Sequence, residues 1–420
     1  MNARFTPALF AHAEAVLGQL LRFEYPADAV VSRYFRDHHQ LGHADRGFVA
    51  ETVFAVLRRG RSIEARCAGR LSDRARLLVA LAVTRGWSQR ELAPVLKASE
   101  EDWLAAAKAM PEADFRPAVR CDLPDWLYDA LEVQFGADEL LRLAAALNQP
   151  APLDLRVNTL KTNREAVLAH FAAEGIAAVP GSLSPLAIRL RDKPALARHP
   201  LFLEGAFEVQ DEGSQLLGYL LEPKRGEMVV DFCAGAGGKT LLLGALMKNT
   251  GRLYAYDVSD KRLARLKPRL ARSGLSNVHP VRIEHERDTR IKRLAGKVDR
   301  VLVDAPCSGL GTLRRNPDLK WRQGEESVAE LAIKQAAILD AAARLVRPGG
   351  RVVYATCSLL TAENEAVVDA FLAGHTDFTL VPASEVLARH GIMLQGDTLR
   401  LLPHLHHTDG FFAAILDRKP

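Results

Sequence analysis

The feature of this sequence that most constrains its fold is a change of pattern after Gly226. From there on, short apolar runs alternate with segments whose apolar residues recur every three or four positions. The runs are MVVD, LYAYDVS, VHPVRI, VDRVLVDAP, RVVYATCS and FFAAIL. Strands that alternate with helices are typical of a parallel, doubly wound α/β sheet. The sequence therefore predicts an α/β domain with such a sheet over residues 223–420.

The residues before this domain divide into two further parts. Over residues 1–115, stretches such as FAHAEAVLGQLL and DRARLLVALAVTRG have helical periodicity, which predicts an all-α domain. Ser88 opens a short helix there, and Glu91 has the spacing of its capping-box partner. Residues 116–222 mix helical patterns with short strands, of which LDLRVNTLK is the best candidate. We therefore expect a helical domain and a mixed α/β segment before the sheet.

The composition limits the class of protein. A formal charge of +5 over 420 residues is consistent with a nucleic-acid partner but does not require one. Basic residues gather between Arg252 and Arg272, where a solvated helix face is an equally good explanation. No apolar run approaches the ~18 residues of a membrane span, and the first residues lack the apolar region of a signal peptide. The five scattered cysteines do not suggest a disulfide framework. We expect a cytoplasmic protein with free thiols and no membrane association.

A glycine-rich loop follows the first strand of the predicted sheet, in DFCAGAGGKT. Ligands of such sheets bind beyond the carboxyl ends of the strands, where glycines let the backbone approach them closely. The loop is neither GxGxxG nor a phosphate-binding Walker A loop, because Cys233 stands where the latter needs glycine. Asp257, at the end of the next strand, suits the hydroxyls of a ribose, although it could instead cap the following helix. The loop and Asp257 together favour a nucleoside cofactor.

Two cysteines also end predicted strands, in DAPCSGLG and YATCS. Cys307 and Cys357 would both lie at the edge of the sheet where ligands bind. A lone cysteine is more often a small buried residue than a reactive one. Two of them at the ends of neighbouring strands favour a catalytic role, but the residues alone do not rank them. Cys67 and Cys121 lie outside the α/β domain and are expected to be structural.

Several of these motifs occur together in one known family. DFCAGAGGKT, DAPCSGLG followed by RRNPDLKW, and YATCS followed by ENE resemble the RNA cytosine-C5 methyltransferases of the RsmB-like (Sun) family. LRVNTLK and GAFEVQDEGSQL upstream also resemble that family, so the likeness covers roughly residues 120–420. The helical first part resembles the NusB-like RNA-binding domain of some members. One departure is that the family's Ala-Pro-Gly-Gly turn has no proline here, where Ala236 precedes Gly237 and Gly238.

The resemblance implies a Rossmann-like methyltransferase domain that binds S-adenosylmethionine. A third acid, after the third strand, is expected to contact the adenine amino group, with Glu286 as the alternative to Asp288. Lys239 would hold the carboxylate of the cofactor or simply end the loop in solvent. The expected cofactor residues are Cys233, Ala234, Gly235, Ala236, Gly237, Gly238, Lys239, Asp257, Asp288 and Asp304.

The resemblance also ranks the cysteines. Carbon 5 of cytosine becomes nucleophilic only after a thiolate adds to carbon 6, and a base must then remove the proton from carbon 5. In this family the nucleophile is the cysteine of Thr-Cys-Ser, here Cys357, and the Pro-Cys cysteine, here Cys307, assists release of the methylated RNA. Asp304 would stabilise charge near N3 of the ring. The expected catalytic residues are therefore Cys357, Cys307 and Asp304.

The expected partner is RNA. Basic and aromatic side chains follow the Pro-Cys turn and could grip phosphates and stack a base, namely Arg314, Arg315, Lys320 and Trp321. Trp321 could equally belong to a core. We expect 16S ribosomal RNA as substrate, with a tRNA cytosine-C5 methyltransferase or an RNA-binding ribosome-assembly factor as alternatives. A monomer is assumed. No metal is expected, because His404, His406 and His407 have no fourth ligand at a recognisable spacing.

Overall fold

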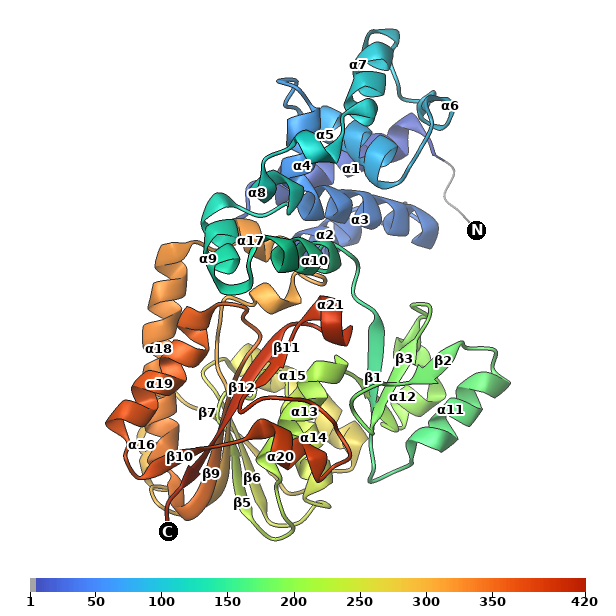
Figure 1. The fold of residues 1–420 in the computed structure, drawn as a ribbon. Helices are drawn as coiled ribbons and strands as arrows, with labels where there is room; N and C mark the ends of the chain where they lie inside the picture. The colour runs from blue at the N-terminus through green and yellow to red at the C-terminus, as the bar shows by residue number, and fades with distance from the viewer. Residues whose placement is uncertain (1–4) are drawn as a thin grey trace. The chain divides into compact units, whose positions relative to one another are not determined.

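A computed structural model describes residues 5–420 of the chain (Figure 1). The chain folds into two compact units, each of which includes segments distant in sequence. Unit 1 consists of Met1–Pro150 and Thr312–Glu325, and unit 2 consists of Ala151–Gly311 and Glu326–Pro420. The short segment after the Pro-Cys turn therefore belongs to the N-terminal unit, although it interrupts the α/β domain in the sequence. The predicted boundaries at 115/116 and 222/223 stay predictions.

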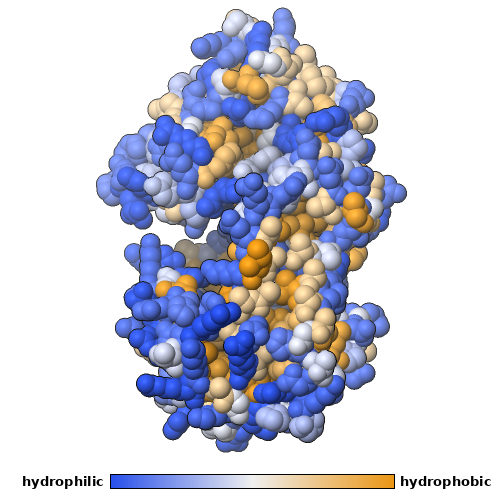
Figure 2. Space-filling model, turned by 90° about the vertical axis from the view of Figure 1, so that its left-hand side faces the viewer, coloured by the Kyte–Doolittle hydropathy of each residue, from blue (hydrophilic) through white to orange (hydrophobic). Residues whose placement is uncertain are grey.

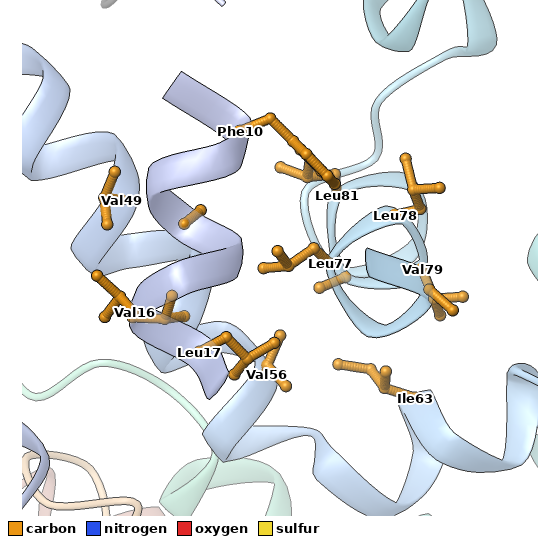
Figure 3. Close-up of a cluster of buried hydrophobic side chains, with 14 of the residues drawn as sticks. Phe10, Val16, Leu17, Val49, Val56, Ile63, Leu77, Leu78, Val79 and Leu81 are labelled. Atoms are coloured by element: carbon orange, nitrogen blue, oxygen red, sulfur yellow. The ribbon is translucent and has the colours of Figure 1, made fainter. Parts of the chain in front are cut away.

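Unit 1 is helical, as expected for the N-terminal part. Its α-helices are α1 (Pro7–Leu20), α2 (Ala27–Asp37), α3 (His43–Arg58), α4 (Gly60–Arg66), α5 (Asp73–Val79), α6 (Gln89–Leu92), α7 (Ala98–Ala109), α8 (Pro117–Arg120), α9 (Asp125–Phe135), α10 (Ala137–Leu147) and α17 (Leu319–Arg322). The predicted capping box of Ser88 and Glu91 is present at the start of α6. Apolar residues on the inner faces of α1, α3 and α5 form the core, and Figure 3 shows Leu17, Val56 and Leu77 pointing toward one another.

Unit 2 contains the predicted sheet. Its strands are β5 (Met228–Asp231), β6 (Arg252–Asp257), β7 (Val278–Arg282), β8 (Val298–Asp304), β9 (Val346–Thr356), β10 (Phe378–Val381), β11 (Leu399–Leu401) and β12 (Phe411–Arg418). Their order is β10-β12-β9-β8-β5-β6-β7, with β11 paired to β12. The strands from β9 to β7 in this order are parallel, which confirms the doubly wound prediction. The strand β12 runs antiparallel to β9, an arrangement that the strand pattern did not predict.

Helices cover both faces of this sheet, as Figure 1 shows. They are α13 (Glu212–Leu221), α14 (Gly238–Leu246), α15 (Asp260–Ser273), α16 (Thr289–Lys292), α18 (Glu325–Ala343), α19 (Glu365–Gly374) and α20 (Ala383–Ala388). The short helix α21 (Pro403–His406) lies in the connection between β11 and β12. Successive strand residues point to opposite faces. Val230 thus packs in the core under α18 and α19, whereas Val229 packs in the core under α13 and α14. Burial on both faces explains why the strands are continuously apolar.

A smaller antiparallel sheet precedes the large one in unit 2. It consists of β1 (Leu153–Val157), β2 (Ala178–Pro180), β3 (Ala187–Leu190) and β4 (Phe207–Val209), in the order β2-β3-β1-β4. The helices α11 (Arg164–Ala173) and α12 (Pro200–Leu203) accompany it. The predicted strand in LDLRVNTLK is β1, while β2, β3 and β4 are too short to give a clear alternation.

Hydrophilic and hydrophobic residues share the face shown in Figure 2. Hydrophobic residues adjoin one another in the middle of this view, and hydrophilic residues border them. Within residues 5–420, no helix has both the length and the apolar character needed to cross a membrane.

Candidate active site

Four neighbouring strands of the large sheet end in polar or reactive residues. Asp231 ends β5, Asp257 ends β6 and Asp304 ends β8. Cys357 directly follows β9, and Cys307 lies three positions beyond the end of β8. Because these strands are parallel neighbours, their carboxyl ends meet at one edge of the sheet. The sequence-predicted catalytic residues are therefore brought together at this edge.

The glycine-rich loop connects β5 to α14 and requires glycine at one position in particular. Gly237 caps α14 with a φ of +84°, and a Cβ there would lie 2.0 Å from Leu266 Cδ1. The Ala234 N–H donates to Tyr256 O at 2.8 Å, and the Gly235 N–H donates to Asp257 Oδ2 at 2.8 Å. The loop is thus fixed to β6 by hydrogen bonds even though it lacks the proline common in the family.

Asp257 organises this loop rather than capping the next helix. Its Oδ1 accepts the Ser259 N–H at 2.7 Å and lies 3.2 Å from the Arg262 guanidinium. The N-cap of α15 is Ser259, whose hydroxyl accepts the Arg262 N–H. The alternative of an Asp257 helix cap is therefore wrong.

Asp288, the third acid expected to bind the cofactor, also accepts hydrogen bonds from nearby backbone N–H groups, as Asp257 does. Asp288 is the N-cap of α16 and accepts the Arg290 N–H at 2.8 Å. Its other oxygen accepts the Glu284 N–H at 3.0 Å. Its rival Glu286 is more exposed and lies 3.9 Å from Arg287. The adenine contact itself remains a prediction for Asp288.

Lys239 forms an ion pair with Asp304, with 2.7 Å between Nζ and Oδ2. Their side chains are 16% and 27% exposed, so the pair is shielded but still reachable. Burial alone would lower the pKa of Lys239, but the charge of Asp304 and the hydrogen bond to it raise that pKa above its ordinary value. Lys239 therefore stays charged and does not simply end the loop in solvent. Its contact with a cofactor carboxylate stays a prediction.

The two cysteines are in contact. Their Sγ atoms are 3.3 Å apart, and the Cys357 N–H donates to Cys307 Sγ at 3.4 Å. The hydrogen bond to Cys357, followed by burial, raises the pKa of Cys307 well above its ordinary value, although that backbone N–H acts in the opposite direction. The Cys307 thiol is therefore favoured in its protonated form.

One acid at this edge was missed by the sequence reasoning. Asp231 is fully buried, and its Oδ2 accepts the Thr240 hydroxyl at 2.7 Å. Its Oδ1 has no hydrogen-bond partner within the described part of the chain. Burial raises the pKa of Asp231 to about 7. Its position at the end of the first strand, directly before the glycine-rich loop, is the signal that could have found it.

The residues expected to grip RNA lie in unit 1. Lys320 is 1% exposed, and its ammonium donates to Arg58 O at 2.7 Å and to Asn148 Oδ1 at 2.9 Å. Burial lowers the pKa of Lys320 to about 7. The Trp321 Nε1–H donates to Leu57 O at 2.8 Å, and its ring packs against the core of unit 1. Both side chains hold α17 in unit 1, and the buried ammonium of Lys320 is not presented to RNA. Trp321 is partly buried, so the alternative of a core residue applies to it in part, and its RNA contact stays a prediction.

The two arginines before them are less deeply engaged. Arg314 is 9% exposed, and its carbonyl accepts Arg58 Nη2 at 3.3 Å. Arg315 is half-buried. RNA contact by Arg314 and Arg315 stays a prediction.

Metal-ligating residues gather elsewhere. Among the described residues, His170, Glu174 and His199 form a group close enough to share an ion, whereas the C-terminal histidines form no such group. His199 Nδ1 already accepts the Leu201 N–H at 3.2 Å. The proton of a neutral imidazole is then on Nε2, which lies 2.7 Å from Glu174 Oε2. The group is thus satisfied by its own hydrogen bonds.

Comparison with known proteins identifies the family. Residues 218–417 match the family model described as 16S rRNA methyltransferase RsmB/F, and residues 123–196 match the ferredoxin-like domain of RsmF/B-like methyltransferases. A probable ribosomal RNA small subunit methyltransferase B of Bacillus subtilis is 33% identical over 77% of this chain, and the match covers 73% of that protein. The chain belongs to the RsmB/F methyltransferase family. The resemblance seen in the sequence motifs is thereby confirmed.

Two further relatives agree with this membership in the RsmB/F family. A probable ribosomal RNA small subunit methyltransferase B of Synechocystis sp. is 40% identical over 70% of this chain. That match spans 66%, just under two thirds, of the Synechocystis protein. The crystal structure of a methyltransferase homolog protein from Pyrococcus horikoshii has a TM-score of 0.62 at 28% identity, covering 77% of this chain and 100% of the other.

Proposed function

We propose that this chain is an S-adenosylmethionine-dependent RNA methyltransferase that methylates carbon 5 of a cytosine, with 16S ribosomal RNA as substrate. The observation that carries the proposal is the pairing of two thiols beside one ion pair. Cys307 and Cys357 have their Sγ atoms 3.3 Å apart, and Lys239 meets Asp304 at 2.7 Å at the same edge of the sheet. This constellation suits covalent activation of a pyrimidine ring.

The loop and its neighbours fit S-adenosylmethionine, a nucleoside with a cationic sulfonium. Burial raises the pKa of the Cys233 thiol, and the charges of Asp304, Asp231 and Asp257 raise it further. The carboxylates of Asp304 and Asp257 place negative charge beside the loop, which favours a bound cation. A Cβ at Gly235 would meet no atom within 4 Å, so the backbone there can be approached closely. We assign binding to this loop from Cys233 to Lys239, to Asp257 and to Asp288; when bound, the cofactor supplies an electrophilic methyl group.

Cys357 is assigned the role of nucleophile. Its thiolate forms a bond to carbon 6 of the cytosine, and the electrons of the 5,6 double bond then make carbon 5 nucleophilic. Lys239 interacts electrostatically with Cys357, so a positive charge lies near the sulfur that is assigned the attack. Asp304, which Lys239 orients, is assigned the stabilisation of the ring at N3 during addition.

Cys307 is assigned the release step. After methylation the proton on carbon 5 must leave, and the bond between Cys357 Sγ and carbon 6 must break as the double bond reforms. Cys307 Sγ lies 3.3 Å from the sulfur that departs, close enough to take part in these proton transfers. In a variant that lacks Cys307, Cys357 would then remain covalently attached to the RNA.

The substrate is expected to present its cytosine outside a helical stack. Enzymes that act on a base need it swung out or unpaired, so a loop or an unfolded assembly intermediate is the expected form. The bacterial relatives carry ribosomal RNA methyltransferase names, which supports ribosomal RNA as substrate and the cytoplasm as location.

The test is methyl transfer from labelled S-adenosylmethionine to separated ribosomal RNA and tRNA pools, with 5-methylcytidine identified by nucleoside mass spectrometry. We expect label in ribosomal RNA with the wild type and none with Cys357→Ala. Label in tRNA alone would show that tRNA, and not ribosomal RNA, is the substrate. RNA binding without any label would favour the assembly-factor alternative and contradict the proposal.

A further inference from the structure

A buried carboxylate lies behind the two cysteines and contacts the loops of both. Glu363 ends the short helix Thr361–Glu363 after β9 and is fully buried. Its Oε1 accepts the Ser308 N–H at 2.8 Å, and its Oε2 accepts the hydroxyls of Ser308 and Ser358. Ser308 directly follows Cys307, and Ser358 directly follows Cys357. A single carboxylate therefore binds the residue next to each thiol.

The surroundings fix this carboxylate in place. Gln335 on α18 donates from Nε2 both to Glu363 Oε1 at 2.9 Å and to Pro306 O at 2.9 Å. The Tyr354 hydroxyl donates to the Glu363 carbonyl at 2.6 Å. Ionised carboxylates buried away from water are costly unless they accept several hydrogen bonds. The Glu363 carboxylate accepts several hydrogen bonds, all of them from neutral donors. The donors in Ser308 and Ser358 belong to the two cysteine loops, and Gln335 also binds the Cys307 loop at Pro306.

The contacts are unequal for the two loops. Glu363 is on the same chain segment as Cys357, six residues along, so the position of Cys357 is also fixed by β9 itself. The Cys307 loop comes from a distant segment, and Glu363 holds it through both the N–H and the hydroxyl of Ser308. Loss of the carboxylate should therefore displace Cys307 more than Cys357. The charge of Glu363 also helps to raise the pKa of Cys307, in which the hydrogen bond to Cys357 and burial are larger causes.

We propose that Glu363 is a positioning residue that holds the Cys307 loop against Cys357 and so supports release of the methylated RNA. The inference rests on the proposed function, since it assigns a part in that same reaction. Within residues 5–420, the Glu363 carboxylate has hydrogen bonds to Ser308, Ser358 and Gln335 but none to the reacting sulfurs, so it acts through the residues that follow the thiols.

Glu363→Gln tests this with little change of shape. The amide keeps one acceptor oxygen but replaces the other with a donor that faces two hydroxyls, and it removes the charge that strengthens the Ser308 bonds. Loosening of the Cys307 loop by about 1 Å is enough to slow a step on the order of 100-fold. Glu365→Gln is the matched control, because Glu365 lies two residues along and pairs with Arg400 instead.

The experiment compares full-length wild type, Glu363→Gln, Glu365→Gln and Cys307→Ala, each with RNA and labelled S-adenosylmethionine. We expect Glu363→Gln to transfer one methyl group per protein in a burst, to turn over on the order of 100-fold more slowly, and to accumulate a protein–RNA adduct on a denaturing gel, as Cys307→Ala does. Binding of RNA and of S-adenosylmethionine should be unchanged. Glu365→Gln should behave as wild type.

Normal turnover without adduct in Glu363→Gln overturns the inference. The inference is also overturned if the burst and the turnover of Glu363→Gln fall by the same factor and no adduct accumulates. That result would mean that Glu363 supports the fold in general and not the release step. If Glu363→Gln does not fold, Ser308→Ala removes one hydroxyl donor and keeps the backbone bond; it should accumulate adduct to a smaller extent, and its failure to do so overturns the inference. Failure of the proposed function is distinct, because wild type would then transfer no methyl group and Cys307→Ala would form no adduct.

Discussion

Replacing Asp231 with Asn should stabilise unit 2 increasingly as the pH rises. Asp231 is 0% exposed, and one of its two oxygens has no hydrogen-bond partner within the described residues. Burial is the main cause that raises its pKa from 3.8 to about 7, and the charges of Asp304 and Asp257 add to it. The hydrogen bond from Thr240 and the charge of Lys239 act in the opposite direction.

The size and sign follow from proton linkage. Between pH 3.8 and about 7 the folded chain keeps a proton on Asp231 that the unfolded chain has lost. Stability therefore falls as the pH rises through this range. A shift of about three units at 1.36 kcal/mol each corresponds to roughly 4 kcal/mol. Asn carries no such charge, so the advantage of Asp231→Asn should grow up to pH about 7 and stay constant above it.

The assay is urea unfolding of wild type and Asp231→Asn from pH 4.5 to 8.5, without cofactor. Asp377→Asn is the control, because Asp377 is 48% exposed and pairs with Arg418 at the surface. A stability difference between Asp231→Asn and wild type that does not change with pH would refute the reasoning. So would a difference that falls as the pH rises.

Three further substitutions probe the cofactor loop and unit 1. Lys239→Met removes the partner of Asp304, and turnover should fall on the order of 100-fold with RNA affinity unchanged, measured by methyl incorporation and filter binding. Gly237→Ala forces a positive φ and a clash with Leu266, so thermal unfolding should show a loss of about 2–4 kcal/mol and less stabilisation by S-adenosylmethionine. Lys320→Ala should lower the free energy of unfolding of unit 1 by roughly 2–4 kcal/mol and leave the salt dependence of RNA binding unchanged. A weaker salt dependence in the variant would instead show that Lys320 contacts a phosphate.

The sheet and its ligand edge could be predicted from the sequence because their signals are local. Each buried parallel strand is a short apolar run that ends in a polar or small residue, so the strand pattern alone places Asp257, Asp304, Cys307 and Cys357 at one edge. That β12 runs antiparallel to β9 could not be predicted. An apolar run such as FFAAIL predicts a strand but not the direction in which that strand pairs with its neighbour.

Contacts between distant segments were also beyond the sequence. Lys320 and Trp321 have the composition of an RNA-binding stretch, but they fill space beside α3 and α10 in unit 1. The ENE motif contributed to the family resemblance, yet what Glu363 does depends on Ser308, which lies 55 positions earlier. Burial and partners of this kind are set by tertiary packing, which residue spacing does not reveal.

The measurement that tests the central claim most directly is a denaturing gel of Cys307→Ala and Cys357→Ala, each incubated with ribosomal RNA and S-adenosylmethionine. The account predicts a slow-migrating protein–RNA adduct with Cys307→Ala and none with Cys357→Ala, because Cys357 forms the bond and Cys307 helps to break it. An adduct only with Cys357→Ala would contradict it and make Cys307 the nucleophile.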